Sequence, residues 1–278
     1  MHAGNAIKTG LKRAVRGAAR LAGVVHPPRP AVRILTYHSV GLRAHAMNVT
    51  PGEFAWQMAW LADNLPVVPL TEAVNPNAPT LAVVITLDDG YADNLHNAAP
   101  ILARHGLHAT VFMVAGRAGG FIDAGGHSEA DRLMSWEELA QWREAGCEVG
   151  AHTMTHARLS TLDEAAQRDE IIGSVALLRE RLGAPVASFA YPFGSALDYD
   201  ETSKRLAQEA GCALAVSNRY GPLDADSDAW QWRRIWIDAT DTRASFIAKA
   251  TGKLDALRML DSRPAITARR AINRVLRA

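Results

Sequence analysis

The stretch EAGCEVGAH, from Glu144 to His152, shows the unit from which this chain is built. Gly146 follows a segment with the pattern of an amphipathic helix and precedes a short β-rich run, and a histidine stands where that run ends. A glycine in this place supplies the left-handed backbone that ends many helices. We therefore predict a helix before Gly146, a strand over Glu148–Ala151 and a functional position at His152.

The same junction occurs twice more, at Gly106 and at Gly211. Strands that alternate with helices build a parallel sheet covered by helices. No glycine-rich nucleotide loop follows the first strand, which favours a barrel over an open sheet. We predict an α/β fold, a distorted (β/α)7 barrel, whose strands cover Val32–Tyr37, Ala82–Leu87, Ala109–Val114, Glu148–Ala151, Ala187–Ala190, Leu214–Ser217 and Ile235–Asp238.

Two acidic residues end the second predicted strand, at the rim where parallel barrels carry their active sites. Asp88 and Asp89 directly follow an apolar run that ends at Leu87. Adjacent buried charges are costly unless a partner neutralises them, although Asp-Asp-Gly also occurs in ordinary turns. The pair is therefore a candidate for catalysis or for metal binding.

Two histidines four residues apart follow the strand that ends at Ala151. In a helix or tight turn this spacing puts His152 and His156 on one face, as metal-binding pairs require. Two histidines alone are more often structural or exposed. With one aspartate they form a ligand set for Zn²⁺ or another first-row divalent ion, and the neighbouring aspartate can then act as a general base.

Three motifs resemble those of the carbohydrate esterase family 4 polysaccharide deacetylases, the NodB homology domain. They are TLDDGY at 86–91, HTMTH at 152–156 and FAYPFG at 189–194. The resemblance covers roughly residues 31–250 and implies a seven-stranded barrel. It assigns Asp88 as catalytic base and Asp89, His152 and His156 as ligands of Zn²⁺, with Co²⁺ and Ni²⁺ as alternatives.

The third motif implies the substrate-binding residues. Tyr191, Pro192 and Phe193 stand where the family binds the acetyl group, and the resemblance assigns the backbone N–H of Phe193 to the oxyanion. Trp230 and Trp232 could stack on sugar rings, but core packing is the better interpretation for both.

The proton donor departs from the family pattern. The usual late Leu-x-His motif is absent, since His156 is the last histidine of the chain. The run Leu35–Val40 resembles the Tyr-His strand that opens the circularly permuted poly-N-acetylglucosamine deacetylases. We therefore predict that His38 donates the proton to the leaving amine, because an imidazole titrates near neutrality.

The arginine that pairs with the base also departs from the pattern. Ala190 stands where many members have this arginine. Arg234 resembles the Arg-Ile that opens the last strand in the permuted branch, and we predict that it pairs with Asp88.

These observations predict a hydrolase that removes N-acetyl groups from an amino-sugar glycan or a glycolipid, its expected partner. Two alternatives stay open. One is a non-catalytic carbohydrate-binding member of the same fold, because the late histidine and the motif arginine are missing. The other is a hydrolase of a different carbon–nitrogen bond, in a formyl, ureide or cyclic amide substrate.

The ends of the chain differ in charge from the middle, although the net formal charge of the 278 residues is only +1. No acidic residue precedes Glu53, whereas basic residues are frequent in the first 33 positions. We predict a basic amphipathic arm with a Pro-rich linker over 1–30, the deacetylase domain over 31–252 and a basic helical extension over 253–278. The arm could lie on an anionic membrane, serve as a transit peptide or dock on the domain.

The remaining expectations concern partners and location. Nucleic acid is not an expected partner, because the basic residues are confined to the ends and no reader motif accompanies them. We find no secretory signal and no transmembrane segment in the sequence. We expect a cytoplasmic protein, with peripheral contact at the inner membrane face as an alternative.

Overall fold

The computed structural model describes residues 30–42, 45–74, 79–123, 128–223, 227–261, 264, 266 and 267. The predicted arm up to residue 29 and residues 268–278 of the predicted extension lie outside these residues. Across the described ranges, none of the helices is both long and apolar enough to cross a membrane.

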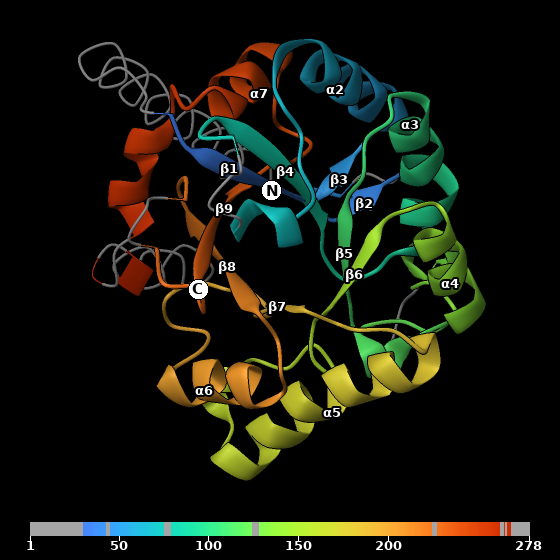
Figure 1. Ribbon diagram of the computed structural model, residues 1–278, viewed down its shortest axis with the longest axis vertical. Helices are drawn as coiled ribbons and strands as arrows, with labels where there is room; N and C mark the ends of the chain where they lie inside the picture. Colours follow the sequence, from blue (N-terminus) through green and yellow to red (C-terminus); the bar gives the residue numbers. More distant parts are fainter. Residues whose placement is uncertain are drawn as a thin grey trace, which may run out of the picture.

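Seven parallel strands close into a barrel, which confirms the predicted fold (Figure 1). Each strand pairs with the next one in the order β1-β4-β5-β6-β7-β8-β9, and β9 pairs with β1 to close the ring. The bounds are β1 Val32–Tyr37, β4 Ala82–Leu87, β5 Thr110–Met113, β6 Glu148–Ala151, β7 Ser188–Ala190, β8 Leu214–Tyr220 and β9 Trp232–Trp236. A separate parallel pair, β2 Ser39–Val40 and β3 Asn48–Val49, follows β1.

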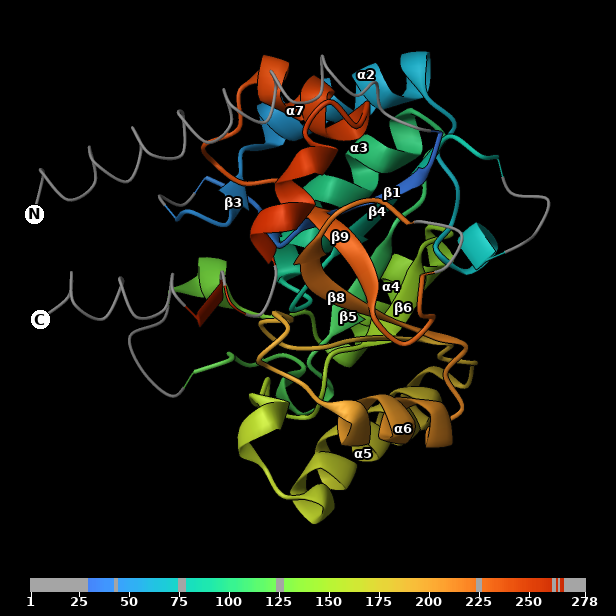
Figure 2. The ribbon, with the colours of Figure 1, turned by 90° about the vertical axis from the view of Figure 1, so that its left-hand side faces the viewer.

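Helices surround the barrel, with α5 and α6 side by side on one flank and α2 and α7 on the opposite flank (Figures 1 and 2). The three predicted junction glycines adopt left-handed backbone, with φ of 64° at Gly106, 82° at Gly146 and 76° at Gly211. The α-helices are α2 Pro51–Asn64, α3 Ala99–Arg104, α4 Trp136–Glu144, α5 Glu164–Leu182, α6 Glu201–Glu209 and α7 Arg243–Ala250. The shorter turns are η1 Thr71–Val74, η2 Asn94–Ala98, η3 Ala115–Arg117, η4 Glu129–Asp131, η5 Leu159–Thr161 and η6 Asp255–Asp261.

The core has two layers, because successive residues of a strand point to opposite faces. Leu35 packs between the strands and the helices, whereas its neighbour Ile34 belongs to a smaller cluster inside the barrel. Burial on both faces explains why the strands are almost continuously apolar. The inner cluster is formed by Ile34, Leu70, Val84, Phe112, Ala190, Leu214, Val216 and Trp232.

The last two strands differ from the predicted bounds. The prediction began the last strand at Ile235, but β9 starts at Trp232 because Trp232 and Arg234 are buried within it. The strand before it continues past the predicted end at Ser217, and its final residues are polar or half-buried. A hydrophobic pattern misses both segments, since their polar side chains are held by specific partners.

Residues 253–261, which the sequence places in the C-terminal extension, pack on the barrel. Leu254 is fully buried, and Arg33 of β1 forms an ion pair of 2.7 Å with Asp255. The backbone N–H of Tyr220 donates to Asp261 at 2.5 Å. This segment therefore covers the outside of β8 and β1.

Candidate active site

The predicted catalytic residues lie together at the carboxyl ends of the barrel strands. His38 follows β1, Asp88 and Asp89 follow β4, and His152 follows β6. All four side chains are buried. Parallel barrels carry their active sites on this rim, so the placement agrees with a catalytic role.

Asp89, His152 and His156 form a compact group that could hold a metal ion. The Oδ1 atom of Asp89 lies 3.5 Å from Nε2 of His152 and 3.4 Å from Nε2 of His156. Ligands about 2.1 Å from a tetrahedral ion are separated by roughly 3.4 Å. Oδ1 of Asp89 is buried and accepts no hydrogen bond from any described residue, so the structure provides an oxygen suited to a cation.

Unusual backbone geometry concentrates at this group. Among the described residues, the non-glycine positions with positive φ are Asp89 (73°), Thr153 (66°), His156 (64°) and Phe193 (60°). Each such conformation costs about 1–3 kcal/mol and persists only where the surroundings impose it. Two of the four are predicted metal ligands, so the fold holds these ligands in place at the expense of stability.

His152 is oriented by the main chain. Its Nδ1 donates to the carbonyl oxygen of Ala190 at 2.7 Å, because that oxygen can only accept. This hydrogen bond fixes the tautomer and leaves the lone pair of Nε2 directed at Asp89. Position 190, where the family arginine is missing, therefore contributes to the site through its backbone.

A carboxylate from α5 holds the turn between the two histidines. Glu170 accepts the backbone N–H groups of Met154 and Thr155, each at 2.9 Å, and the hydroxyl of Thr155 at 2.6 Å. The hydroxyl of Thr153 accepts the N–H of His156 at 2.9 Å. The turn is therefore fixed independently of any metal ion.

Asp88 forms a buried pair with Arg234. Two parallel hydrogen bonds of 2.6 Å join the guanidinium to both carboxylate oxygens, and neither side chain is exposed. Burial is the largest single influence and raises the pKa of Asp88, but the charge and hydrogen bonds of Arg234, with the nearby histidines, together outweigh it, and the pKa lies below its ordinary value. Asp88 is therefore a carboxylate at neutral pH and can accept a proton.

Arg234 has further acceptors that hold it in the barrel. Its Nε donates to the carbonyl of Ser217 at 3.0 Å, and Nη2 donates to Oδ1 of Asn218 at 2.6 Å. The guanidinium also lies over the ring of Phe112, 5.4 Å from its centroid. The arginine is therefore supported from β8 and β5 as well as by Asp88.

His38 also lies close to the carboxylate of Asp88. Its Nε2 is 4.0 Å from Oδ2 of Asp88, and its ring packs edge-on against Trp236 at a centroid distance of 6.4 Å. Burial lowers the pKa of His38 from its ordinary value, although the charges of Asp89 and Asp88 oppose this effect. His38 is therefore neutral at pH 7 in the free protein.

The three residues predicted to bind substrate are placed differently. Phe193 is 44% exposed and its ring lies 4.9 Å from that of His156, beside the site. Tyr191 is fully buried, and its hydroxyl donates to the carbonyl of Trp230 at 2.8 Å. Pro192 is buried as well. The structure thus brings Phe193 to the site and places Tyr191 in the core.

Phe193 is held from its outer side by an arginine. The guanidinium carbon of Arg158 lies 4.2 Å from the centroid of the ring, and Arg158 is ion-paired with Asp198. The N–H of Phe193 donates to no acceptor in the described part of the chain. It is therefore available to a ligand.

Three residues at the site were absent from the sequence prediction. Asn218 lies just beyond the predicted end of β8, so the strand-end rule could have indicated it. Trp236 ends β9 and is 43% exposed beside His38. The sequence prediction missed it because the predicted strand ran on to Asp238 and placed Trp236 in its interior. Glu170 carries no local sequence signal. Trp232, in contrast, packs inside the barrel as the sequence indicated.

The family follows from comparison with known proteins. Residues 75–215 match the model of the polysaccharide deacetylases. The chain belongs to the polysaccharide deacetylase family. It is 27% identical over 221 residues to YxkH of Bacillus subtilis, a proposed polysaccharide deacetylase. The aligned residues make up 77% of this chain and 74% of that protein. As a member of this family it is a hydrolase of carbon–nitrogen bonds.

Solved structures share the fold. IcaB from Ammonifex degensii superposes with a TM-score of 0.69 at 24% identity, covering 82% of this chain and 98% of that one. The Streptococcus pyogenes deacetylase PplD, solved with acetate, superposes with a TM-score of 0.68 at 21% identity, covering 80% and 99%. These two structures therefore share the barrel fold of this chain.

Proposed function

We propose that the protein is a metal-dependent deacetylase that removes N-acetyl groups from an amino-sugar glycan or glycolipid. The observation that carries the proposal is the buried Asp88–Arg234 pair beside the group of Asp89, His152 and His156. The pair supplies a charged base, and the group supplies ligands for a cation.

The metal ion would be held by Asp89, His152 and His156. We propose Zn²⁺, with Co²⁺ and Ni²⁺ as alternatives, since two imidazoles and one carboxylate suit these ions. When bound, the ion would lower the pKa of a water molecule and polarise the acetyl carbonyl. The unpaired Oδ1 of Asp89 and the oriented Nε2 of His152 support this assignment.

Asp88 would remove the proton from the attacking water. Arg234 keeps its pKa low, so the carboxylate is ready at neutral pH, and the two parallel hydrogen bonds fix its orientation. A base held in this way contributes roughly 10²–10⁴-fold to the rate.

His38 would protonate the departing amine. It is neutral in the free protein, so it must first acquire a proton, and the nearest base on the site is Asp88, 4.0 Å away. The N–H of Phe193 would donate to the oxyanion, since the described residues leave it without an acceptor. Breaking the carbon–nitrogen bond then yields acetate and the free amino sugar.

The proposal is tested by acetate release from a panel of N-acetylated glycans and glycolipids. The full chain is assayed after metal removal and again with Zn²⁺, Co²⁺ or Ni²⁺ added. We expect release that depends on an added ion and falls at least about 100-fold in Asp88→Asn.

A matched control separates loss of the base from loss of the fold. Asp169→Asn alters an exposed carboxylate of α5 and should keep full activity. Full activity of Asp88→Asn in the presence of metal would refute the mechanism. Formate or an opened ring as the product, instead of acetate, would show that the enzyme acts on a different carbon–nitrogen bond.

A further inference from the structure

The segment that follows β4 holds the main chain on both sides of His38. The backbone N–H of Asp88 donates to the carbonyl of Tyr37, the residue before His38, at 2.9 Å. The carbonyl of His38 itself accepts the side-chain amide of Asn94 at 2.8 Å. The predicted base and the predicted proton donor are thus joined through one short stretch of chain.

The amide of Asn94 is fully buried, and its neighbours fix its orientation. The carbonyl of His38 and the ionised carboxylate of Asp93, which is 3.0 Å away, can only accept, so the amide nitrogen must face them. The Oδ1 atom of Asn94 is buried and accepts no hydrogen bond from the residues that the structure describes. Because burying an unpaired oxygen costs stability, stability alone does not explain an asparagine at this position.

Asp93 holds the two residues that follow His38. Its carboxylate accepts the hydroxyl of Ser39 and, at 3.1 Å, the backbone N–H of Val40. Asn97 donates to the carbonyl of Val40 at 2.7 Å. Polar side chains of a single segment therefore bind the main chain from His38 to Val40.

This segment has an unusual backbone. The turn η2 is a π-helix, in which the N–H of Ala99 donates to the carbonyl of Asn94, five residues earlier. Turns of this kind are rare and occur frequently at functional sites. The turn comes soon after Asp88 and Asp89 in the chain, so the support of His38 is contiguous with the metal-binding group.

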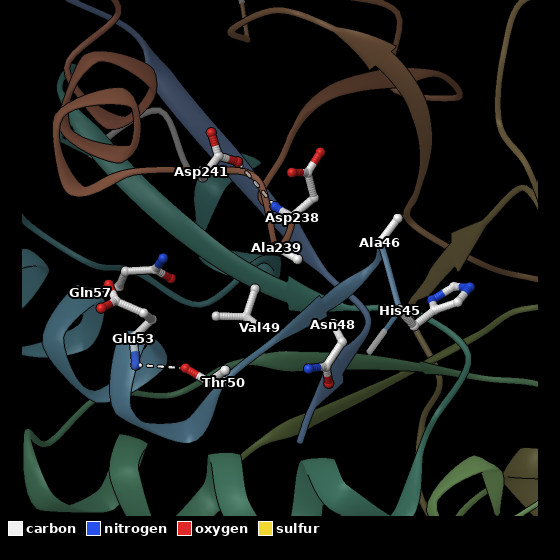
Figure 3. A pocket seen from close by; sticks show the side chains of 10 residues that line it. All are labelled: His45, Ala46, Asn48, Val49, Thr50, Glu53, Gln57, Asp238, Ala239 and Asp241. Atoms are coloured by element: carbon white, nitrogen blue, oxygen red, sulfur yellow. Dashed lines mark hydrogen bonds between the residues drawn. The ribbon is translucent and has the colours of Figure 1, made fainter. Parts of the chain in front are cut away.

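The β2–β3 pair that follows His38 borders a cavity of about 350 Å³ (Figure 3). Asn48 and Val49 of β3 line this cavity together with the start of α2. Within the pair, Asn48 exchanges two hydrogen bonds with the main chain of Gly41, at 2.9 and 2.8 Å. The pair is therefore held together internally but is not packed solidly on every side, so the hydrogen bonds from η2 fix its position against the barrel.

We infer that Asp93 and Asn94 are positioning residues for the proton donor. They hold the main chain of His38, whose Nε2 then lies 4.0 Å from Oδ2 of Asp88. The alignment of a catalytic group is sensitive, since a displacement of about 1 Å can lower a rate about 100-fold. The inference rests on the proposed function and adds two residues that lie outside the motifs which predict the site.

The test is a double-mutant cycle with His38→Gln in the metal-loaded full chain. Asn94→Ala removes the donor to the carbonyl of His38, and the control Asn64→Ala removes a similar hydrogen bond, of 2.8 Å to the carbonyl of Trp60, at the exposed end of α2. On the best N-acetylated substrate of the panel, Asn94→Ala should lower kcat about tenfold with KM unchanged. In the His38→Gln background it should cause no further loss, and Asn64→Ala should have no effect in either background.

An activated aryl acetate separates the donor from the rest of the site, since its leaving group needs no proton. Asn94→Ala should keep the wild-type rate on this substrate, because the metal ligands and Asp88 are unchanged. Ser39→Ala removes the hydroxyl that Asp93 accepts and should give the same selectivity with a smaller loss. This variant decides the question if Asn94→Ala does not fold.

Three results would overturn the inference: no loss in Asn94→Ala, an equal loss on the aryl acetate, or a loss that multiplies with that of His38→Gln. NMR spectra of the protein with isotope-labelled histidine give a readout without turnover, in which the ring signals of His38 are those missing from His38→Gln. They should shift in Asn94→Ala and stay in place in Asn64→Ala. If the wild type releases acetate from no substrate, the proposed function fails, and unchanged His38 signals in Asn94→Ala would overturn the positioning role separately.

Discussion

The Asp88–Arg234 pair allows a quantitative prediction. Arg234→Met removes the guanidinium and keeps much of the side-chain volume, so the buried carboxylate of Asp88 loses its countercharge. Removing one partner of a buried ion pair destabilises a protein by about 3–5 kcal/mol. Since domains are stable by only about 5–15 kcal/mol, urea unfolding should detect this loss easily.

The loss should depend on pH with a definite sign. In the wild type the pKa of Asp88 is depressed, so its contribution to stability is present above the unfolded value of about 3.9 and disappears as the pH falls further. In Arg234→Met burial dominates and raises the pKa. The variant should therefore be most destabilised near pH 8 and recover stability as the pH falls and Asp88 takes up a proton.

The pH dependence of activity should also follow the protonation of Asp88. The alkaline plateau of kcat/KM in Arg234→Met should begin at higher pH than in the wild type, because the base must lose its proton first. A double variant tests whether Asp88 and Arg234 stabilise the protein as a charge pair. Asp88→Asn/Arg234→Met removes both charges and must be more stable than Arg234→Met at pH 8, and equal or lower stability would show that the pair does not act as described.

Three further predictions concern neighbouring groups. Glu170→Gln should weaken metal binding about 10–100-fold by loosening the turn between the histidines, with Glu180→Gln on the same helix as an unaffected control, and metal titration checks both. His38→Gln should lower kcat on an N-acetyl sugar about 10²-fold or more but spare an activated aryl acetate, whose leaving group needs no proton. Tyr191→Phe should cost about 1–2 kcal/mol in thermal unfolding, because the carbonyl of Trp230 loses its donor, and should leave KM unchanged.

The fold could be predicted because its signals are local. Glycine caps after helices and apolar runs of strand length placed all seven strands, and the closed order of the barrel agrees. The bounds differed by more than one residue only where a strand carries polar residues, as at Arg234 in β9 and Asn218 in β8. These side chains are buried because of partners on other strands, which no local pattern contains.

Part of the site could also be predicted because its signals are local in the sequence. Asp88, Asp89, His152 and His156 lie in short motifs at strand ends, and the structure brings them together with His38 and Arg234. Tyr191 also follows a strand, yet it turns into the core. Glu170 acts from the middle of a helix, where its role depends on which loop lies opposite.

The hydrogen bond from His152 to position 190 has an evolutionary consequence. The acceptor is a main-chain carbonyl, so a substitution of the side chain at position 190 leaves the orientation of the histidine unchanged. The side chain at position 190 can therefore vary without disturbing this predicted metal ligand. The guanidinium that pairs with the predicted base comes from β9 instead, so the two tasks are carried by separate strands.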